Sequence, residues 1–347
     1  MKKYLTTAFA VIALFSCNKK ETTTVSEAQS DSLQTSVGTA PDSTTPNTIK
    51  LAIEDSAGIY TQRLFLQKGQ TYPLVTYQRN VQSMTGPDGK KATATSNSTD
   101  EMSFLVNSVE NGVYAITINL LGKSSSQTAN GKTVRIDTRT SAPKEPELKM
   151  MYEINKALAG KKLQMQMDQT GKVLSIKGFE PIYNEINKLA TTHIKDAEQR
   201  KGFIQSFQAN FNEKTINEQF SKNLIVLPKT GAKIGQKWSE TENASQDGSS
   251  KFTTHYTLDE VKDGKVKITV RGGIPRKSDK RTQEGITQTI TSELSQTGSI
   301  FLDQESGWIK NQNITVKTDQ TETLSDGKQS QSLKSSNTAT IIVNPEK

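Results

Sequence analysis

Hydrophobic and polar residues alternate along most of the chain from Ile49 onward, and this period of two predicts β-strands. The clearest instance is a hairpin in which Phe104–Val109 and Val113–Leu120 flank the turn Glu110-Asn111-Gly112. Asn-Gly tolerates the positive φ angles of a type I′ turn, which joins neighbouring antiparallel strands. The pattern therefore predicts a domain built mainly of antiparallel β-structure.

The apolar period changes in two places. Pro146 is expected to open a short helix that Gly160 closes. Between residues 181 and 227 the apolar residues stand three or four positions apart, which predicts two or three amphipathic helices. A sheet with one apolar face must bury that face against another element, so we expect these helices to cover it.

Three short markers occur twice along the chain in the same order. They are Gly69-Gln70-Thr71-Tyr72 and Gly235-Gln236-Lys237-Trp238, the Asn111-Gly112 and Asp263-Gly264 hairpins, and the turns Asp168–Gly171 and Asp303–Gly307. Such internal similarity is typical of a duplicated unit. We therefore predict an α+β fold, mainly antiparallel β, in which a bent sheet or half-barrel is built from two similar β-units.

The predicted fold occupies one domain, residues 49–347. Its halves are residues 49–180 and 228–347, and the helical insert at 181–227 covers one face of the sheet. Two stretches, Gly86–Asp100 and Thr318–Asn337, lack apolar residues at regular spacing and are expected to be polar loops.

The first residues have the features of an export signal. Lys2 and Lys3 precede the apolar run Tyr4–Phe15, which is shorter than the about 20 residues that cross a bilayer as a helix. Ser16 and Cys17, the only cysteine in the chain, follow directly. This arrangement resembles the lipobox of bacterial lipoproteins, which implies that residues 1–16 are removed and that Cys17 is lipidated. The alternative is an unmodified thiol after an ordinary cleavage site.

Lipidation would attach the protein to a membrane, since each buried methylene of an acyl chain contributes about 0.8 kcal/mol. Residues 17–48 are rich in Ser and Thr and poor in apolar side chains, so we expect a disordered tether behind the anchor. Asn18 follows the cysteine where Asp often marks retention at the inner membrane in lipoproteins. The predicted location is therefore the outer membrane, facing the periplasm or exposed on the cell surface.

Three segments together resemble a known group of proteins. They are Leu64–Tyr72, Gly171–Phe179 and Leu227–Trp238. In this order they are similar to a family of uncharacterised Bacteroidota lipoproteins, known only as a domain of unknown function, and the likeness runs from Leu64 to about Val316. It implies no catalytic residues. The predicted architecture also resembles the half-barrel of envelope lipoprotein carriers, which shelter acyl chains.

Sequence motifs for catalysis or metal binding are absent. The two histidines, His193 and His255, have no His-x-x-x-His or Cys-x-x-Cys spacing around them, and no Gly-x-Ser-x-Gly elbow occurs. The net charge of +8 is scattered and aromatic residues make up 6% of the chain, which does not favour nucleic-acid binding. We expect no cofactor, no metal and a non-enzymatic role, although paired carboxylates keep an enzyme possible.

A hydrophobic ligand is one candidate partner. Met165 and Met167 share one face of a strand, and Phe203, Phe207 and Phe211 share one face of a helix, so they are the candidate ligand-lining residues if sheet and helices leave a space. The alternative for these residues is an ordinary core. The alternative for the protein is a structural lipoprotein whose polar loops dock on another envelope protein.

Overall fold

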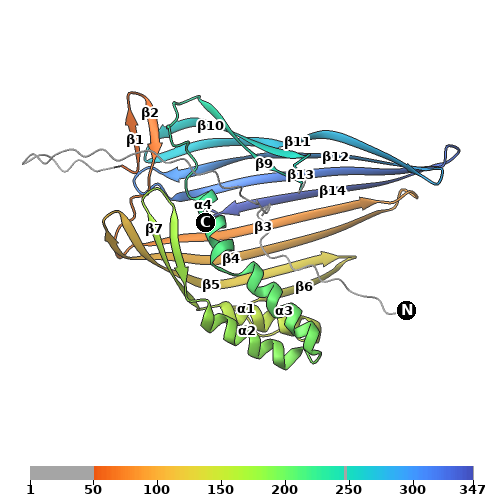
Figure 1. The fold of residues 1–347 in the computed structure, drawn as a ribbon, viewed down its shortest axis with the longest axis horizontal. Coiled ribbons are helices and arrows are strands. Elements are labelled where there is room, and N and C mark those ends of the chain that lie inside the picture. The colour runs from red at the N-terminus through yellow and green to blue at the C-terminus, as the bar shows by residue number, and fades with distance from the viewer. Residues whose placement is uncertain (1–50, 246–247, 347) are drawn as a thin grey trace, which may run out of the picture.

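The computed structural model describes residues 51–245 and 248–346. Figure 1 shows a large bent sheet with helices grouped beside one end of it. The sheet has twelve strands, and it stays open because its first and last strands do not pair. The predicted α+β fold with a bent antiparallel sheet is therefore confirmed.

The strands that precede the helices are β1 (Ile53–Ser56), β2 (Ile59–Gln62), β3 (Thr71–Thr85), β4 (Lys91–Glu110), β5 (Val113–Ala129), β6 (Lys132–Asp137), β7 (Lys162–Asp168) and β8 (Val173–Lys177). The strands that follow them are β9 (Lys237–Asn243), β10 (Lys251–Lys262), β11 (Lys265–Gln283), β12 (Ile286–Asp303), β13 (Ile309–Ser325) and β14 (Ser330–Val343). The helices are α1 (Pro146–Leu158), α2 (Glu180–His193), α3 (Ala197–Asn210) and α4 (Glu213–Asn223).

The strand order across the large sheet is β8-β7-β5-β4-β3-β14-β13-β12-β11-β10-β9, and β6 pairs with the end of β5. We call β3, β4, β5, β7 and β8 the first β-unit and β9–β13 the second β-unit. Strand β14 joins them, because it pairs with β13 on one side and with β3 on the other. The short β1–β2 hairpin forms a separate sheet.

The first marker of the repeat has the same hydrogen bonds in both units. Gly69 N–H donates to the carbonyl of Val106, whose own N–H donates to the carbonyl of Gln70. In the second unit, Gly235, Leu258 and Gln236 form the same two bonds. The next aromatic residues also match, since Tyr72 pairs with Phe104 and Trp238 pairs with Tyr256.

The other two markers meet in space in each unit. Gln169 N–H donates to the carbonyl of Gly112, and Gln304 N–H donates to the carbonyl of Gly264. The preceding aspartates cap their turns alike: Asp168 accepts from the backbone and hydroxyl of Thr170, and Asp303 accepts from those of Ser306. Two similar β-units are thus visible at the level of single hydrogen bonds.

The units differ in what is inserted. In the first unit, β6 and α1 lie between β5 and β7, whereas β11 continues directly into β12 in the second. Helices α2, α3 and α4 follow β8. Pro146 begins α1 and residues 180–223 form the other helices, as the apolar spacing predicts.

The hydrophobic core forms two clusters on the same face of the sheet. One lies between the first unit and the helices and includes Phe104, Met165 and Ile186; the other lies on the second unit and includes Leu258 and Ile300. The amide of Gln62 lies at their boundary. Its nitrogen donates to the carbonyls of Leu224 and Gly307, and its oxygen accepts from the N–H groups of Val226 and Leu227.

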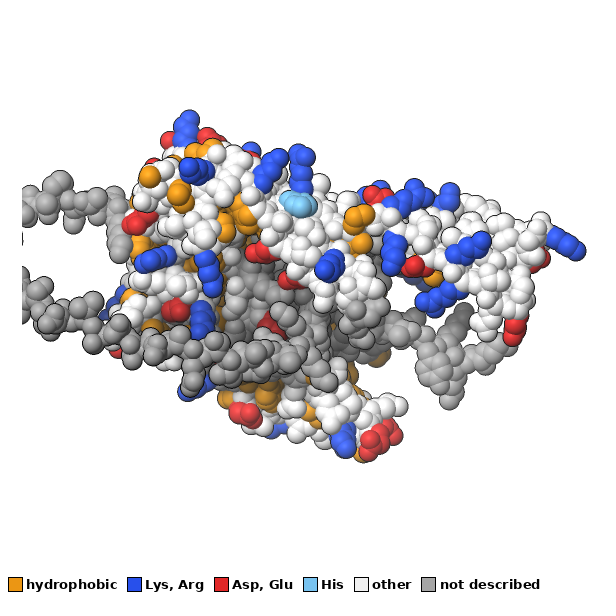
Figure 2. All heavy atoms as spheres, turned by 45° about the horizontal axis from the view of Figure 1, so that its top comes forward, with side chains coloured by type: hydrophobic (Ala, Val, Ile, Leu, Met, Phe, Trp, Pro, Cys, Tyr) orange, Lys and Arg blue, Asp and Glu red, His pale blue; other side chains and the backbone are white. Residues whose placement is uncertain are grey.

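Two predicted loops are in fact strands. Most of Gly86–Asp100 belongs to β4, and Thr318–Asn337 supplies the ends of β13 and β14 around a short turn. These polar ends extend the sheet well beyond the helices (Figure 1). On the face visible in Figure 2, the projecting hairpins carry few hydrophobic side chains, whereas apolar surface gathers at the base of the sheet. Both faces of this extension lack the long apolar alternation that sequence reasoning relies on.

Candidate functional site

The two faces of the sheet have different neighbours. Phe104 on β4 packs against Phe220 of α4, with ring centroids 5.1 Å apart, so its side of the sheet is the helix-bearing face. Residues an even number of positions away on a regular strand share that face. The opposite face carries the residues between them, such as Thr315 and Thr323 on β13.

An apolar band continues along the helix-bearing face beyond the helices. We define the band as Met84, Ile286, Leu294, Val316 and Leu324, which lie on β3, β12 and β13. Three of them are substantially exposed, at 43% for Met84, 51% for Ile286 and 44% for Leu324. Between Ile286 and Leu294, the interleaved positions of β12 on the opposite face are hydroxyl or charged residues. The helix-bearing face of the extension therefore carries exposed apolar side chains among polar ones such as Gln288 and Glu322, which hydrogen-bond to each other at 2.6 Å.

The helices do not reach this band. Their packing against the sheet involves mainly β5, β6 and β8, at the other side of the molecule. No helix among the described residues has the length and apolar character that would let it cross a membrane.

The predicted ligand-lining methionines are fully buried. Met165 and Met167 are 1% and 0% exposed and belong to the cluster between sheet and helices. Their neighbours include Ile182 and Ile186 of α2 in the same cluster. The structure therefore brings the methionines onto the predicted face, within a packed core.

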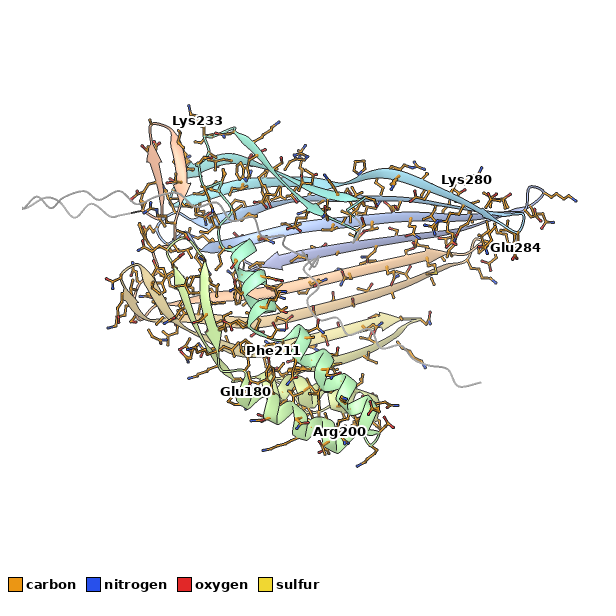
Figure 3. All side chains as sticks on the ribbon, in the orientation of Figure 1. Glu180, Arg200, Phe211, Lys233, Lys280 and Glu284 are labelled. Atoms are coloured by element: carbon orange, nitrogen blue, oxygen red, sulfur yellow. The ribbon has the colours of Figure 1, made fainter. Side chains whose placement is uncertain are left out.

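The predicted phenylalanines gather against α2 and the residue before it. Phe211 lies 5.6 Å from Phe179 and 5.6 Å from Phe207, measured between ring centroids. Figure 3 shows Phe211 at the end of α3, near the start of α2 that Glu180 marks. Phe203, Phe207 and Phe211 are all partly buried and pack on the same cluster as the methionines. Cys17, the predicted lipidation site, lies outside the described residues.

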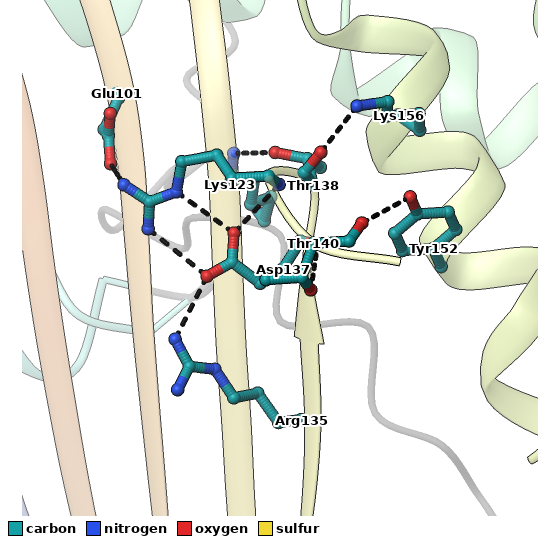
Figure 4. Close-up of polar contacts among 9 residues, drawn as sticks. Glu101, Lys123, Arg135, Asp137, Thr138, Thr140, Tyr152 and Lys156 are labelled. Carbon is teal, nitrogen blue, oxygen red and sulfur yellow. Dashed lines mark hydrogen bonds and ion pairs between the residues drawn. The ribbon is translucent and has the colours of Figure 1, made fainter. Parts of the chain in front are cut away.

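An ion-pair network joins the end of β6 to β4, beside α1 (Figure 4). Asp137 accepts from Arg139 at 3.1 Å and from Arg135 at 3.0 Å, and Arg139 also contacts Glu101 at 2.7 Å. The side chain of Arg139, and then its backbone N–H, hold the pKa of the Asp137 carboxyl at about 2, below its ordinary value of 3.8. Lys156 of α1 donates to the neighbouring Thr138 carbonyl at 2.7 Å.

The histidines lie apart from each other. His193 Nε2 contacts Glu153 at 2.6 Å and so joins α2 to α1, while His255 is exposed on β10. In residues 51–245 and 248–346, His, Cys, Asp and Glu form no group of three or more that could hold a metal. The perturbed carboxyl of Asp137 is explained by its arginine partners and does not need a catalytic role.

Sequence reasoning missed two features of the extension. One is the apolar band, whose only signal on β12 is an Ile or Leu at every fourth position, Ile286, Ile290 and Leu294. The other is a groove of about 520 Å³ on the opposite face, which Arg79 and Arg135 line together with hydroxyl side chains. Either feature can be found from the sequence only if the polar segments Gly86–Asp100 and Thr318–Asn337 are recognised as strands.

Comparison with known proteins places the chain in a family without assigning a function. No curated protein matches it. A structure described as lipid-protein interactions in lipovitellin is 10% identical, with a TM-score of 0.32, and covers 80% of this chain and 25% of that chain. The chain thus spans about a quarter of the lipovitellin chain.

Two further structures match more weakly. An outer membrane channel from Pseudomonas putida F1 is 9% identical, with a TM-score of 0.16, and covers 84% of this chain and 99% of that one. OccK7 (OpdD) from Pseudomonas aeruginosa is 6% identical, also with a TM-score of 0.16, and covers 79% and 98%. These values are too low to indicate a shared function. The model of the family of unknown function DUF6263, in contrast, matches residues 111–309, more than half of the chain, and the protein belongs to that family.

Proposed function

We propose that this protein is a lipid-anchored, non-enzymatic lipoprotein of the outer membrane that binds an apolar, lipid-like ligand on the helix-bearing face of its sheet. The anchor is supported by the sequence around Cys17, where a basic start and a short apolar run precede a single cysteine. Ligand binding is supported by the apolar side chains that stay exposed on the helix-bearing face of the sheet.

The apolar band carries the binding proposal. A sheet with one apolar face gains about 25 cal/mol for each Å² of apolar surface removed from water. Met84, Ile286 and Leu324 leave such surface open on the helix-bearing face, where a ligand could cover it. The band adjoins the core cluster of the second unit, against which Val316 packs, so a ligand lying on it would extend that core. Acyl chains have the length and flexibility to follow a strand in this way.

Paired substitutions on one strand test ligand binding. Leu324→Lys places a charge on the apolar band, and Thr323→Lys places the same charge on the opposite face of β13. Titration with a fluorescent fatty acid, dansyl-undecanoic acid, is expected to give saturable binding to the full chain. We expect Leu324→Lys to weaken that binding about tenfold, which is about 1.4 kcal/mol, and Thr323→Lys to leave it unchanged. Equal effects of both substitutions, or no saturable binding, would exclude the proposed ligand site.

Metabolic labelling with an alkyne analogue of palmitate tests the anchor separately. The chain is expected to carry the label and to fractionate with the outer membrane, and Cys17→Ala is expected to remove the label. A labelled Cys17→Ala chain, or an unmodified protein that retains Met1, would contradict the lipoprotein assignment.

A second candidate is a structural lipoprotein that docks on another envelope protein. The observation that favours it is the distance to which the long hairpins project: Lys280 and Glu284 mark the tip of β11–β12, far from the helices that Arg200 marks (Figure 3). Photo-crosslinking from position 284 in intact cells is expected to capture one reproducible partner. The same crosslinks from position 200 on α3 would show that the hairpins are not responsible.

A further inference from the structure

One polar row crosses four strands on the face opposite the helices. Arg79 on β3 pairs with Asn97 on β4. Ser126 on β5 pairs with Asn97 on one side and with Arg135 of β6 on the other. Neighbouring strands lie about 4.8 Å apart, so the backbones of the two arginines stand about 14 Å apart across the row.

A groove of about 520 Å³ lies over this row. Its floor is held by hydrogen bonds between side chains: the Tyr77 hydroxyl donates to Oδ1 of Asn97 at 3.0 Å, and Nδ2 of Asn97 donates to the Ser126 hydroxyl at 3.3 Å. The rows on either side add further hydroxyl groups, including Thr95 and Ser124. The groove therefore presents fixed donors and acceptors at regular spacing.

The charge of the groove has one sign. Its lining contains two arginines and no Asp or Glu. Arg79 is exposed, and among residues 51–245 and 248–346 no carboxylate forms an ion pair with it. Arg135 contacts Asp137 at 3.0 Å, but Arg139 holds the same carboxylate, and a guanidinium has five N–H donors. Both ends of the groove can therefore still donate to an anion.

We infer that this groove binds an acidic oligosaccharide, with acid groups at Arg79 and Arg135 and sugar hydroxyls over the floor between them. The arginine fork matches carboxylate, sulfate and phosphate groups with two parallel hydrogen bonds. Sugar hydroxyls donate and accept, as do the Ser, Thr and Asn side chains beneath them. Single-stranded nucleic acid fits less well, because it needs several aromatic rings for stacking and only Tyr77 lines the groove.

This site is independent of the apolar band, because the two lie on opposite faces of the sheet. Substitutions in the groove leave Leu324 and its neighbours in place. Loss of fatty-acid binding therefore does not affect the oligosaccharide proposal, and the reverse also holds.

Calorimetric titration of the full chain with trigalacturonate, and with neutral maltotriose as the matched sugar, tests the inference. Trigalacturonate is expected to bind at low salt and to bind more weakly as salt rises. Arg79→Gln is expected to weaken this binding at least tenfold, and Arg135→Gln to weaken it similarly. Arg271→Gln, an exposed arginine on β11 of the second unit, is the control and is expected to bind as the native chain does.

Arg79→Gln is the decisive variant because Arg135 also contacts Asp137, and its replacement alters the ion pairs of that carboxylate. Circular dichroism melting checks that each variant is folded. The proposal is overturned if folded Arg79→Gln binds trigalacturonate like the native chain, if maltotriose binds equally well, or if trigalacturonate shows no binding.

Discussion

The two β-units share their turns but not their cover. In both units a Gly-Gln pair enters the first strand, a Gly-containing hairpin follows, and an aspartate-capped turn docks onto that hairpin. The first unit is then covered by helices, which bury Phe104 completely. The second unit is covered by β1 and by the segment after α4, through Ile53, Leu227 and Ala232.

This difference separates what turns specify from what packing specifies. The turns set which strands pair and in which register, because their hydrogen bonds recur almost unchanged. The elements that pack on each unit are set by its apolar side chains, because the first unit buries the larger set of them. Aromatic positions that are equivalent by register should therefore contribute unequally to stability.

The largest expected difference is between the aromatic residues Phe104 and Tyr256, which occupy equivalent positions. Phe104 is 0% exposed and packs between Phe220 and Trp308, whereas Tyr256 is half-buried and stacks only on Trp238 at 5.5 Å. We expect Phe104→Ala to lower the free energy of unfolding by about 4 kcal/mol and Tyr256→Ala by about 2 kcal/mol. Urea unfolding followed by circular dichroism measures both.

The control for this pair is His255→Ala, an exposed position beside Tyr256 on the other face of β10, which should stay within about 0.5 kcal/mol of the native chain. Equal losses for the two aromatic substitutions would mean that the helices add no stability to the first unit.

The second comparison concerns the turn glycines. Gly307 and Gly171 have φ angles of +73° and +75°, so alanine at either position is strained by about 1–2 kcal/mol. The added Cβ at Gly307 would also meet the backbone carbonyl of Arg63, whereas at Gly171 it would meet the side chain of Ile225, which can rotate. We expect Gly307→Ala to cost about 3 kcal/mol and Gly171→Ala about 1–2 kcal/mol in thermal unfolding.

Gly131→Ala isolates the backbone contribution. Its φ angle is +74° and no atom lies within 4 Å of the position that a Cβ would occupy, so only the strain of the left-handed conformation remains. If all three alanine variants lost the same stability, close packing at the Asp303 turn would play no part.

Turns and helices were predictable because their signals are local. Asn111-Gly112 has φ angles of +50° and +75°, as its sequence predicts, and Pro146 begins α1. The repeat was detectable for the same reason, since each marker is a few adjacent residues. The long polar strands were not predictable. Their hydroxyl side chains on one face alternate with a mixture of amide, small and apolar side chains on the other, and this hides the period of two.

The candidate sites were missed because they depend on contacts between distant segments. Arg79 and Arg135 become part of one row only through the registers of three strand pairs. Gln62 gives no sequence signal for its buried role, since its four hydrogen-bond partners lie more than 160 residues away. Met165 and Met167 were placed correctly on the helix-bearing face, whereas whether they ever contact a ligand stays a prediction.

The smallest expected effect concerns the insertion that only the first unit contains. Asp137 belongs to β6, and its carboxyl has a pKa of about 2 because Arg139, and to a smaller extent Arg135, favour the charged form. A pKa lowered in the folded state adds stability above the unfolded value of about 3.8, and this stability is lost as pH falls toward 2. The arginines are largely exposed and screened by solvent, so we expect Asp137→Asn to cost about 1–2 kcal/mol at pH 7.

Urea unfolding of the native and Asp137→Asn chains between pH 7 and pH 2 tests this sign. The difference in unfolding free energy should be constant down to about pH 4 and then shrink toward pH 2, because the Asp137 carboxyl takes up its proton in the unfolded chain before it does so in the folded one. Asp279→Asn, which removes an exposed carboxylate 3.9 Å from Lys277 on the second unit, is the matched control and should change stability by less than about 0.5 kcal/mol at any pH. A difference for Asp137→Asn that persists at pH 2 would assign its cost to lost hydrogen bonds rather than to charge, and the insertion would then be fastened to the sheet without help from its ion pairs.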